Sequence, residues 1–183
     1  MILLFTGNGK GKTTAALGQM VRVLGRGKSA LMIQFIKGPW RSGEDELAEK
    51  LEKSSAIPDV KFEIRKRGLG FVGILGDQLP REEHAAAARK ALAEFVAERK
   101  AAPPAGSWHL IVLDEINVAL SLDLLKIGDV LAAIQDYPAN RILVLTGRGA
   151  PPELVAAADL VTEMKELKHP FGQGERAKFT VEY

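Results

Sequence analysis

A loop rich in glycine and lysine near the start of the chain has the residue types that bind phosphate. It reads Thr6-Gly7-Asn8-Gly9-Lys10-Gly11-Lys12-Thr13-Thr14 and follows the apolar run Met1–Phe5. Glycines let backbone N–H groups turn inward, and the N-terminus of a following helix adds partial positive charge. In such a loop Lys12 neutralises phosphate and the Thr13 hydroxyl is a ligand for magnesium. These residues predict a P-loop that binds a nucleoside triphosphate.

The register of this loop differs from the general P-loop consensus. In G-x-x-x-x-G-K-[ST] the first glycine would be Thr6, so the loop is better written Gly7-x-x-x-Gly11-Lys12-Thr13, one residue shorter. A glycine-rich turn without a ligand is the alternative. The strand expected before the loop and the helix expected after it favour the phosphate site.

Two carboxylates follow another apolar run. Asp114 and Glu115 come directly after Leu110–Leu113. A P-loop needs a magnesium-supporting acid at the end of a neighbouring strand, and this pair supplies one. The alternative is that the pair only caps the next segment of the chain, which the nearby P-loop makes less favoured.

Three further candidates follow predicted strands, at the edge where open α/β sheets bind ligands. Lys37 and Trp40 come just after Ala30–Ile36, and Arg148 comes after Ile142–Leu145. We expect Lys37 and Trp40 to face a substrate and Arg148 to meet phosphate or ribose. The alternatives are a solvated lysine, a packed aromatic ring and a surface salt bridge.

Short apolar runs alternate with segments of helical period, which predicts an α/β fold. We expect a single P-loop NTPase-like (RecA-like) domain over residues 1–183, with a mostly parallel sheet and helices on both faces. The predicted strands are Met1–Phe5, Ala30–Ile36, Val60–Ile64, Leu110–Leu113, Ile142–Leu145, Leu160–Met164 and Phe179–Tyr183. The predicted helices are Thr13–Leu24, Glu44–Lys53, Arg81–Lys100, Leu124–Gln135 and Pro152–Ala157.

Composition excludes several classes of protein. The chain of 183 residues is 46% hydrophobic, carries a net charge of +2 and contains no cysteine. These values argue against disorder, disulfides and thiolate metal sites, and they fit a reducing compartment. Met1–Phe5 is too short to span a bilayer, so we expect a cytoplasmic protein with no membrane partner. The basic cluster Lys61, Arg65, Lys66 and Arg67 is expected to be a solvated strand edge and not a nucleic-acid site.

Five segments together resemble the ATP:corrinoid adenosyltransferase family, the cob(I)alamin or cob(I)yrinic acid a,c-diamide type, whose P-loop is similarly short. They are Phe5-Thr6-Gly7-Asn8-Gly9-Lys10-Gly11-Lys12-Thr13-Thr14-Ala15-Ala16, Gln34-Phe35-Ile36-Lys37-Gly38 with Trp40, Leu113-Asp114-Glu115-Ile116-Asn117, Leu145-Thr146-Gly147-Arg148-Gly149, and Ala157–Glu163 leading to Lys168-His169-Pro170-Phe171.

The resemblance implies transfer of the 5′-deoxyadenosyl group of ATP to a reduced cobalt(I) corrinoid, with triphosphate leaving. It implies that Gly7 to Thr14 bind triphosphate, that Lys12 stabilises its departure, and that Thr13 and Glu115, with Asp114 nearby, hold Mg²⁺. A corrinoid reductase and a homodimer are implied partners. A small P-loop kinase or ATPase, or a non-catalytic corrinoid- or nucleotide-binding chaperone, is the alternative function.

The segment Gly70-Phe71-Val72-Gly73 departs from the family pattern. Many relatives carry Gly-Phe-Thr-Trp here, whose aromatic residues help to displace the lower ligand of cobalt and shape the corrinoid pocket. Phe71 retains the first aromatic residue and Gly73 stands at the tryptophan position. The resemblance therefore implies a catalytic, corrinoid-side role for Phe71 and leaves the choice between complete and precursor corrinoid open. His169 is expected to be structural or to contact substrate, and not to bind metal.

Overall fold

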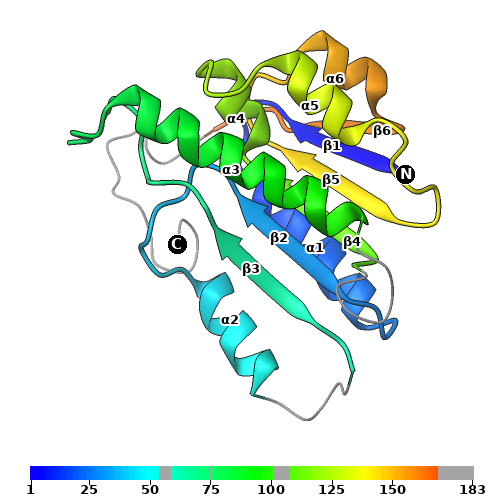
Figure 1. Cartoon of the computed structure of the whole chain (residues 1–183). Helices are drawn as coiled ribbons and strands as arrows, with labels where there is room; N and C mark the ends of the chain where they lie inside the picture. The colour runs from blue at the N-terminus through cyan, green and yellow to red at the C-terminus, as the bar shows by residue number, and fades with distance from the viewer. Residues whose placement is uncertain (54–58, 75, 101–107, 169–183) are drawn as a thin grey trace.

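The fold is built on one parallel β-sheet (Figure 1). The computed structural model describes residues 1–53, 59–74, 76–100 and 108–168. Within these residues the sheet has six strands in the order β3-β2-β4-β5-β1-β6, and every neighbouring pair is parallel. The strands are β1 (Ile2–Thr6), β2 (Ala30–Gln34), β3 (Phe62–Lys66), β4 (Leu110–Asp114), β5 (Ile142–Thr146) and β6 (Leu160–Glu163). The expected α/β fold is confirmed, while the extent of one domain over residues 1–183 stays a prediction.

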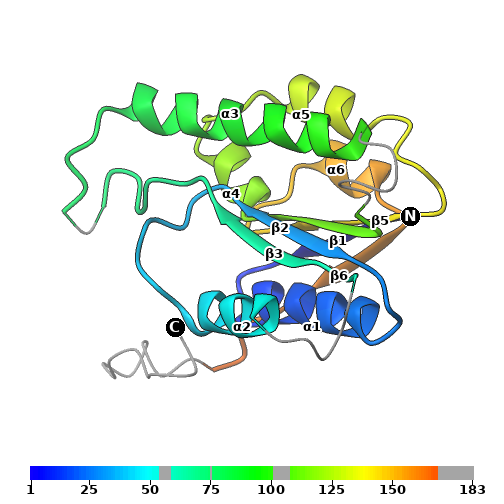
Figure 2. The ribbon, with the colours of Figure 1, turned by 60° about the horizontal axis from the view of Figure 1, so that its bottom comes forward.

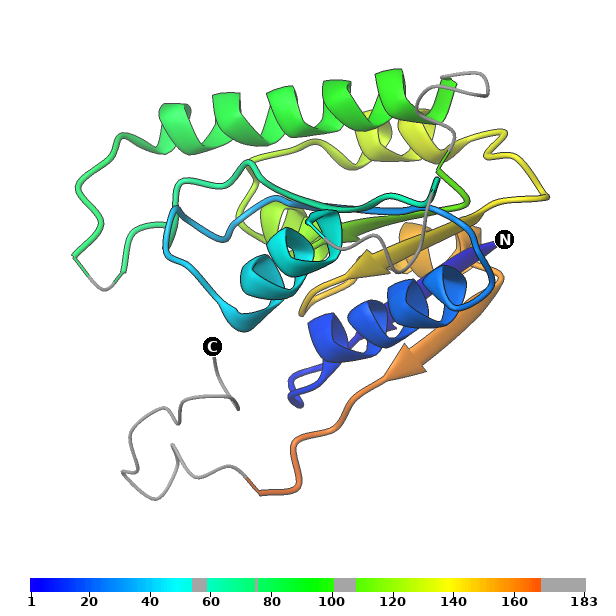
Figure 3. The same cartoon turned by 90° about the horizontal axis from the view of Figure 1, so that it is seen from below.

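Helices cover both faces of the sheet (Figure 2). Viewed from below, α1 and α2 lie on the same face (Figure 3), and α3 to α6 lie on the other. Their bounds are α1 (Lys12–Leu24), α2 (Gly43–Glu52), α3 (Arg81–Lys100), α4 (Ile116–Ser121), α5 (Ile127–Ile134) and α6 (Pro152–Ala157). None of these helices in the described parts of the chain has both the length and the apolar character needed to cross a bilayer.

The central strands hold the two helical layers together. All five residues of β2 and all five of β4 are buried. Along β4, Ile111 and Leu113 pack into the core under α3, whereas Leu110 and Val112 pack into the core above α1. Burial of such a side chain contributes about 1.5–3 kcal/mol. The two-sided apolar run therefore fixes β4 at the centre of the sheet, with Asp114 at its carboxyl end.

Several element boundaries differ from the prediction. Helix α4 was not expected, and the following helix begins at Ile127 instead of Leu124 because its N-cap, Lys126, has an extended backbone with φ −90° and ψ 138°. Strand β3 runs over Phe62–Lys66 instead of Val60–Ile64, in register with all of β2. The predicted strand Phe179–Tyr183 lies outside the described residues.

The basic cluster beside β3 is ion-paired, so the expected solvated edge is wrong for three of its four residues. The Arg65 guanidinium contacts three carboxylates, and its Nη1 lies 2.8 Å from Glu94 Oε1 on α3. Arg67 also pairs with Glu94, and Lys66 pairs with Asp45 on α2. These ion pairs join β3 to a helix on each face of the sheet, while the absence of a nucleic-acid site stays a prediction.

Candidate functional site

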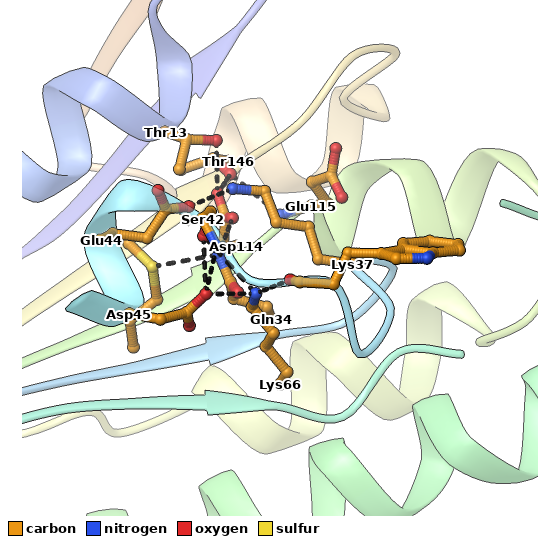
Figure 4. Close-up of polar contacts among 12 residues, drawn as sticks. Thr13, Gln34, Lys37, Ser42, Glu44, Asp45, Lys66, Asp114, Glu115 and Thr146 are labelled. Carbon is orange, nitrogen blue, oxygen red and sulfur yellow. Dashed lines mark hydrogen bonds and ion pairs between the residues drawn. The ribbon is translucent and has the colours of Figure 1, made fainter. Parts of the chain in front are cut away.

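The candidate residues lie where the parallel strands end. The loops after β1, β2, β4 and β5 leave the same edge of the sheet, because all of these strands run in one direction. Figure 4 shows the side chains of Thr13, Gln34 and Thr146 converging on Asp114, from the start of α1 and the ends of β2 and β5 respectively. This is the edge at which open α/β sheets bind ligands.

The P-loop has glycine where no other residue fits. Gly7 has a φ of 93°, and a Cβ there would lie 2.4 Å from the Met164 carbonyl oxygen. A Cβ on Gly9 would lie 2.8 Å from the same oxygen, to which the Gly9 N–H donates a hydrogen bond of 2.7 Å. Gly11 is the N-cap of α1 and has a φ of 112°. The backbone at these three positions therefore favours glycine, and the segment after β6 forms one wall of the loop.

Lys12 lies across the mouth of this loop. Its Nζ donates to the carbonyl oxygens of Gly7 and Gly9, at 2.8 and 2.6 Å. Partial burial lowers the pKa of Lys12, and the positive charge of Arg148 lowers it further, against the opposing effect of Glu115 and Asp114. Lys12 and Arg148 therefore contribute positive charge to the same part of the site. Asn8, Lys10 and Thr14 are exposed on the rim of the loop.

The position of Arg148 is set by a tight turn after β5. Gly147 has a φ of 131°, its N–H donates to the Phe5 carbonyl oxygen at 3.2 Å, and its own carbonyl oxygen accepts from Asn117 Nδ2 at 3.1 Å. A Cβ on Gly147 would lie 2.9 Å from Asn117 Cβ. These contacts hold the turn that carries the exposed Arg148 between α4 and the end of β1.

Asp114 is fully buried and accepts hydrogen bonds from three elements. Its Oδ1 accepts from Thr13 Oγ1 at 2.9 Å and from Thr146 Oγ1 at 2.7 Å, and its Oδ2 accepts from Gln34 Nε2 at 3.1 Å. Sequence analysis missed Gln34 and Thr146. The signal was weak: Gln34 interrupts the apolar run Ala30–Ile36, and Thr146 directly follows the apolar run Ile142–Leu145. The Oε1 atom of Gln34 is buried and has no hydrogen-bond partner among the described residues.

Glu115 is held in an unusual backbone conformation. Its φ is 63°, it is the N-cap of α4, and its N–H donates to Thr146 Oγ1 at 2.9 Å. Burial, together with the negative charge of Asp114, raises the pKa of Glu115 to about 7, although Lys37, Lys12 and Arg148 oppose the rise. A divalent cation would relieve this repulsion. The Thr13 hydroxyl and the two carboxylates supply the hard oxygen atoms that Mg²⁺ prefers, so these residues fit a magnesium site.

Lys37 is not the solvated lysine that was the alternative to a substrate-facing role. Its Nζ lies 2.5 Å from Glu44 Oε1, and both side chains are largely shielded from solvent. Burial alone would lower its pKa, but the negative charge of Asp114 and the bond to Glu44 outweigh burial and raise the pKa. Lys37 therefore carries a positive charge that faces the acidic pair from the loop after β2 (Figure 4).

An exposed aromatic pair stands beside this charged centre. Trp40 is 62% exposed and Phe71 is 46% exposed, and their ring centroids are 5.9 Å apart. The Trp40 ring lies over two glycines, since a Cβ on Gly38 or on Gly70 would come within 2.8 Å of it. The packed-aromatic alternative for Trp40 is thus wrong, because most of the ring remains open to a ligand.

The aromatic pair and the carboxylates are linked through one residue. The Gln34 side chain binds Asp114, and the Gln34 carbonyl oxygen accepts from Arg67 N at 2.9 Å and Gly68 N at 3.0 Å. The loop that carries Phe71 therefore begins directly beside the acidic centre. The structure brings all the predicted site residues to this edge, except that His169 lies outside the described residues.

Comparison with known proteins agrees with this geometry. The family model described as "ATP:corrinoid adenosyltransferase BtuR/CobO/CobP" matches residues 1–183. The chain is 34% identical to a corrinoid adenosyltransferase of Escherichia coli K12 over 100% of this chain and 85% of that protein. It is 38% identical to one from Pseudomonas aeruginosa over 100% of this chain and 83% of that protein. A Sinorhizobium corrinoid adenosyltransferase is 35% identical over 100% of this chain and 80% of its own length.

Proposed function

Since this chain belongs to the ATP:corrinoid adenosyltransferase family, we propose that it transfers the 5′-deoxyadenosyl group of ATP to the cobalt of a reduced corrinoid. The observation that carries this proposal is the position of the Trp40–Phe71 pair. An exposed aromatic surface beside a P-loop and an acidic centre fits a second, largely apolar substrate next to the nucleotide. Hydrolysis of ATP needs only water as the second substrate, so it does not require an exposed aromatic surface.

In the proposed reaction the electron pair of cobalt(I) forms a bond to C5′ of ATP. The bond between C5′ and the triphosphate oxygen breaks, and triphosphate leaves with the electrons of that bond. Because cobalt is the nucleophile, no side chain has to remove a proton. The protein must hold C5′ in line with cobalt and stabilise the charge that develops on the leaving oxygen.

The described residues suit these two tasks. Lys12 and the loop N–H groups bind the triphosphate, with Arg148 on its open side. Thr13, Glu115 and Asp114 would hold Mg²⁺, which when bound supplies positive charge against the triphosphate. Lys37 adds a fixed positive charge on the other side of the acidic pair. Trp40 and Phe71 orient the corrinoid.

Anaerobic spectroscopy with chemically reduced cobalamin and magnesium–ATP tests the proposal. We expect a light-sensitive alkylcobalt spectrum together with triphosphate, and we expect Lys12→Ala to lose both while Lys90→Ala, an exposed lysine on α3, retains them. Unchanged cobalt(I) with ADP would instead support a kinase or ATPase. Tight binding of both substrates without turnover, in cobalamin and in precursor corrinoids alike, would support the chaperone function.

The proposal extends to partners and location. Cobalt(I) must be supplied by a corrinoid reductase, because neither ATP nor the described side chains provide electrons. A homodimer is proposed from the family resemblance and is tested by the native mass in solution. The absence of cysteine fits a reducing compartment such as the cytoplasm.

A further inference from the structure

A buried histidine–carboxylate pair lies at the foot of the loop that carries Phe71. His84 Nε2 on α3 is 3.0 Å from Asp77 Oδ2, and the two side chains are only 2% and 8% exposed. Asp77 Oδ2 also accepts from the Gly73 N–H at 2.8 Å, and Asp77 Oδ1 accepts from the Leu79 N–H at 3.1 Å. None of these residues belongs to the nucleotide site, so the cluster needs its own explanation.

The loop is attached at both ends, and Phe71 lies between the attachments. At the first end, backbone N–H groups of Arg67, Gly68 and Gly70 donate to carbonyl oxygens of Gln34 and Ile36. At the second end, the Asp77 carboxylate is the acceptor that holds the chain. Val72, next to Phe71, packs against the core, and the Asp77 carboxylate adds the hydrogen bonds that hold the backbone after it.

The Asp77 cluster also accounts for glycine at position 73. Gly73 has a φ of 69°, a conformation that disfavours side chains, yet a Cβ there would meet nothing within 4 Å. Glycine is therefore favoured at position 73 by the backbone conformation of the turn that brings its N–H to Asp77. Lack of space for a side chain is not the reason.

We propose that Asp77 and His84 are positioning residues that hold the Phe71 segment, residues 67–74, so that Phe71 stays against Trp40 and meets the corrinoid. This inference rests on the proposed function. The N–H groups of Gly73 and Leu79 lower the pKa of Asp77, so the carboxylate is ionised and acts as acceptor. His84 therefore donates from Nε2, and its burial in α3 ties the loop to the helical layer.

Two His84 variants of similar size separate the hydrogen bond from packing. Gln places a donor where Nε2 lies, whereas Leu fills the space without one. We expect His84→Leu to raise the KM for the corrinoid by about tenfold, with the KM for ATP changed by less than about twofold. His84→Gln should keep both KM values at the wild-type level. Asp77→Ala should raise the KM for the corrinoid as His84→Leu does. Arg89→Ala, an exposed change on the same helix, is the control.

A second measurement does not depend on activity. Amide hydrogen exchange at Gly73 and Leu79 should become at least about tenfold faster in His84→Leu than in wild type, and should stay protected in His84→Gln. Equal exchange in the two variants, or a rise in both KM values together, would overturn the positioning role. If the wild-type protein transfers no adenosyl group but the exchange pattern holds, the proposed function fails and the loop attachment stands.

Discussion

Replacement of Glu115 by glutamine should stabilise the ligand-free protein at alkaline pH. Burial and the neighbouring negative charge of Asp114 raise the pKa of Glu115 from 4.5 to about 7. The folded protein therefore holds this proton more tightly than the unfolded chain does. The stabilising contribution of the protonated group is lost as the pH rises from about 4.5 to about 7, and it is absent above that window.

The size of the effect follows from the same pKa. A difference between 4.5 and about 7, at about 1.36 kcal/mol per pH unit, sets a ceiling of about 3 kcal/mol for the cost of the ionised Glu115 side chain. Glutamine keeps the shape and has no charge. Glu115→Gln should thus exceed the wild type in unfolding free energy by up to about 3 kcal/mol near pH 8, and by less than about 1 kcal/mol near pH 5.

Urea unfolding with EDTA and without nucleotide, at both pH values, measures this difference. Glu153→Gln, which removes an exposed carboxylate on α6, is the matched control and should change stability by no more than about 0.5 kcal/mol. Magnesium–ATP should reverse the order by stabilising the wild type more than the variant. A Glu115→Gln protein that is no more stable than wild type near pH 8 would refute the reasoning that the acidic pair is strained without a cation.

Three other changes test separate parts of the site. Lys12→Ala should lower the rate of triphosphate release by at least about a hundredfold under single-turnover conditions, because the positive charge that stabilises the leaving triphosphate is lost. Gly7→Ala should abolish ATP binding by calorimetry, since its Cβ would lie 2.4 Å from the Met164 carbonyl oxygen; Gly18→Ala, where a Cβ meets nothing within 4 Å, should bind ATP normally. Trp40→Ala should raise the corrinoid KM about tenfold and leave the ATP KM and the melting temperature nearly unchanged, because most of the ring is exposed.

The sheet was predictable because its strands are apolar on both faces. A run such as Leu110–Leu113 is typical of a central strand in a parallel sheet, because helices cover both faces of the sheet there. Helix α4 was not predictable in this way, because it has only six residues, Ile116–Ser121, and begins after Glu115, whose backbone is in the left-handed conformation. That backbone conformation belongs to the acidic site, and local propensity does not encode it.

The P-loop was predictable as a linear motif, whereas the partners of Asp114 were not. Gln34 and Thr146 meet Asp114 only because β2 and β5 flank β4 in the sheet. That order is a property of tertiary packing, and the sequence shows only a polar residue within the first apolar run and another directly after the second. The Asp77–His84 pair is hidden for a related reason, since a turn and the start of a helix bring the two side chains together.

The two acidic residues of the centre have different tasks, and their hydrogen bonds separate them. Asp114 accepts three side-chain hydrogen bonds and joins the ends of β2 and β5 to the start of α1, so most of its capacity is already used for positioning. Glu115 receives no side-chain hydrogen bond among the described residues and has a raised pKa. Its oxygens are therefore the more available ones for a cation, while Asp114 fixes the Thr13 hydroxyl that would share it. Loss of the Asp114 charge should disturb the architecture of the site, and loss of the Glu115 charge should remove cation binding and leave the architecture intact.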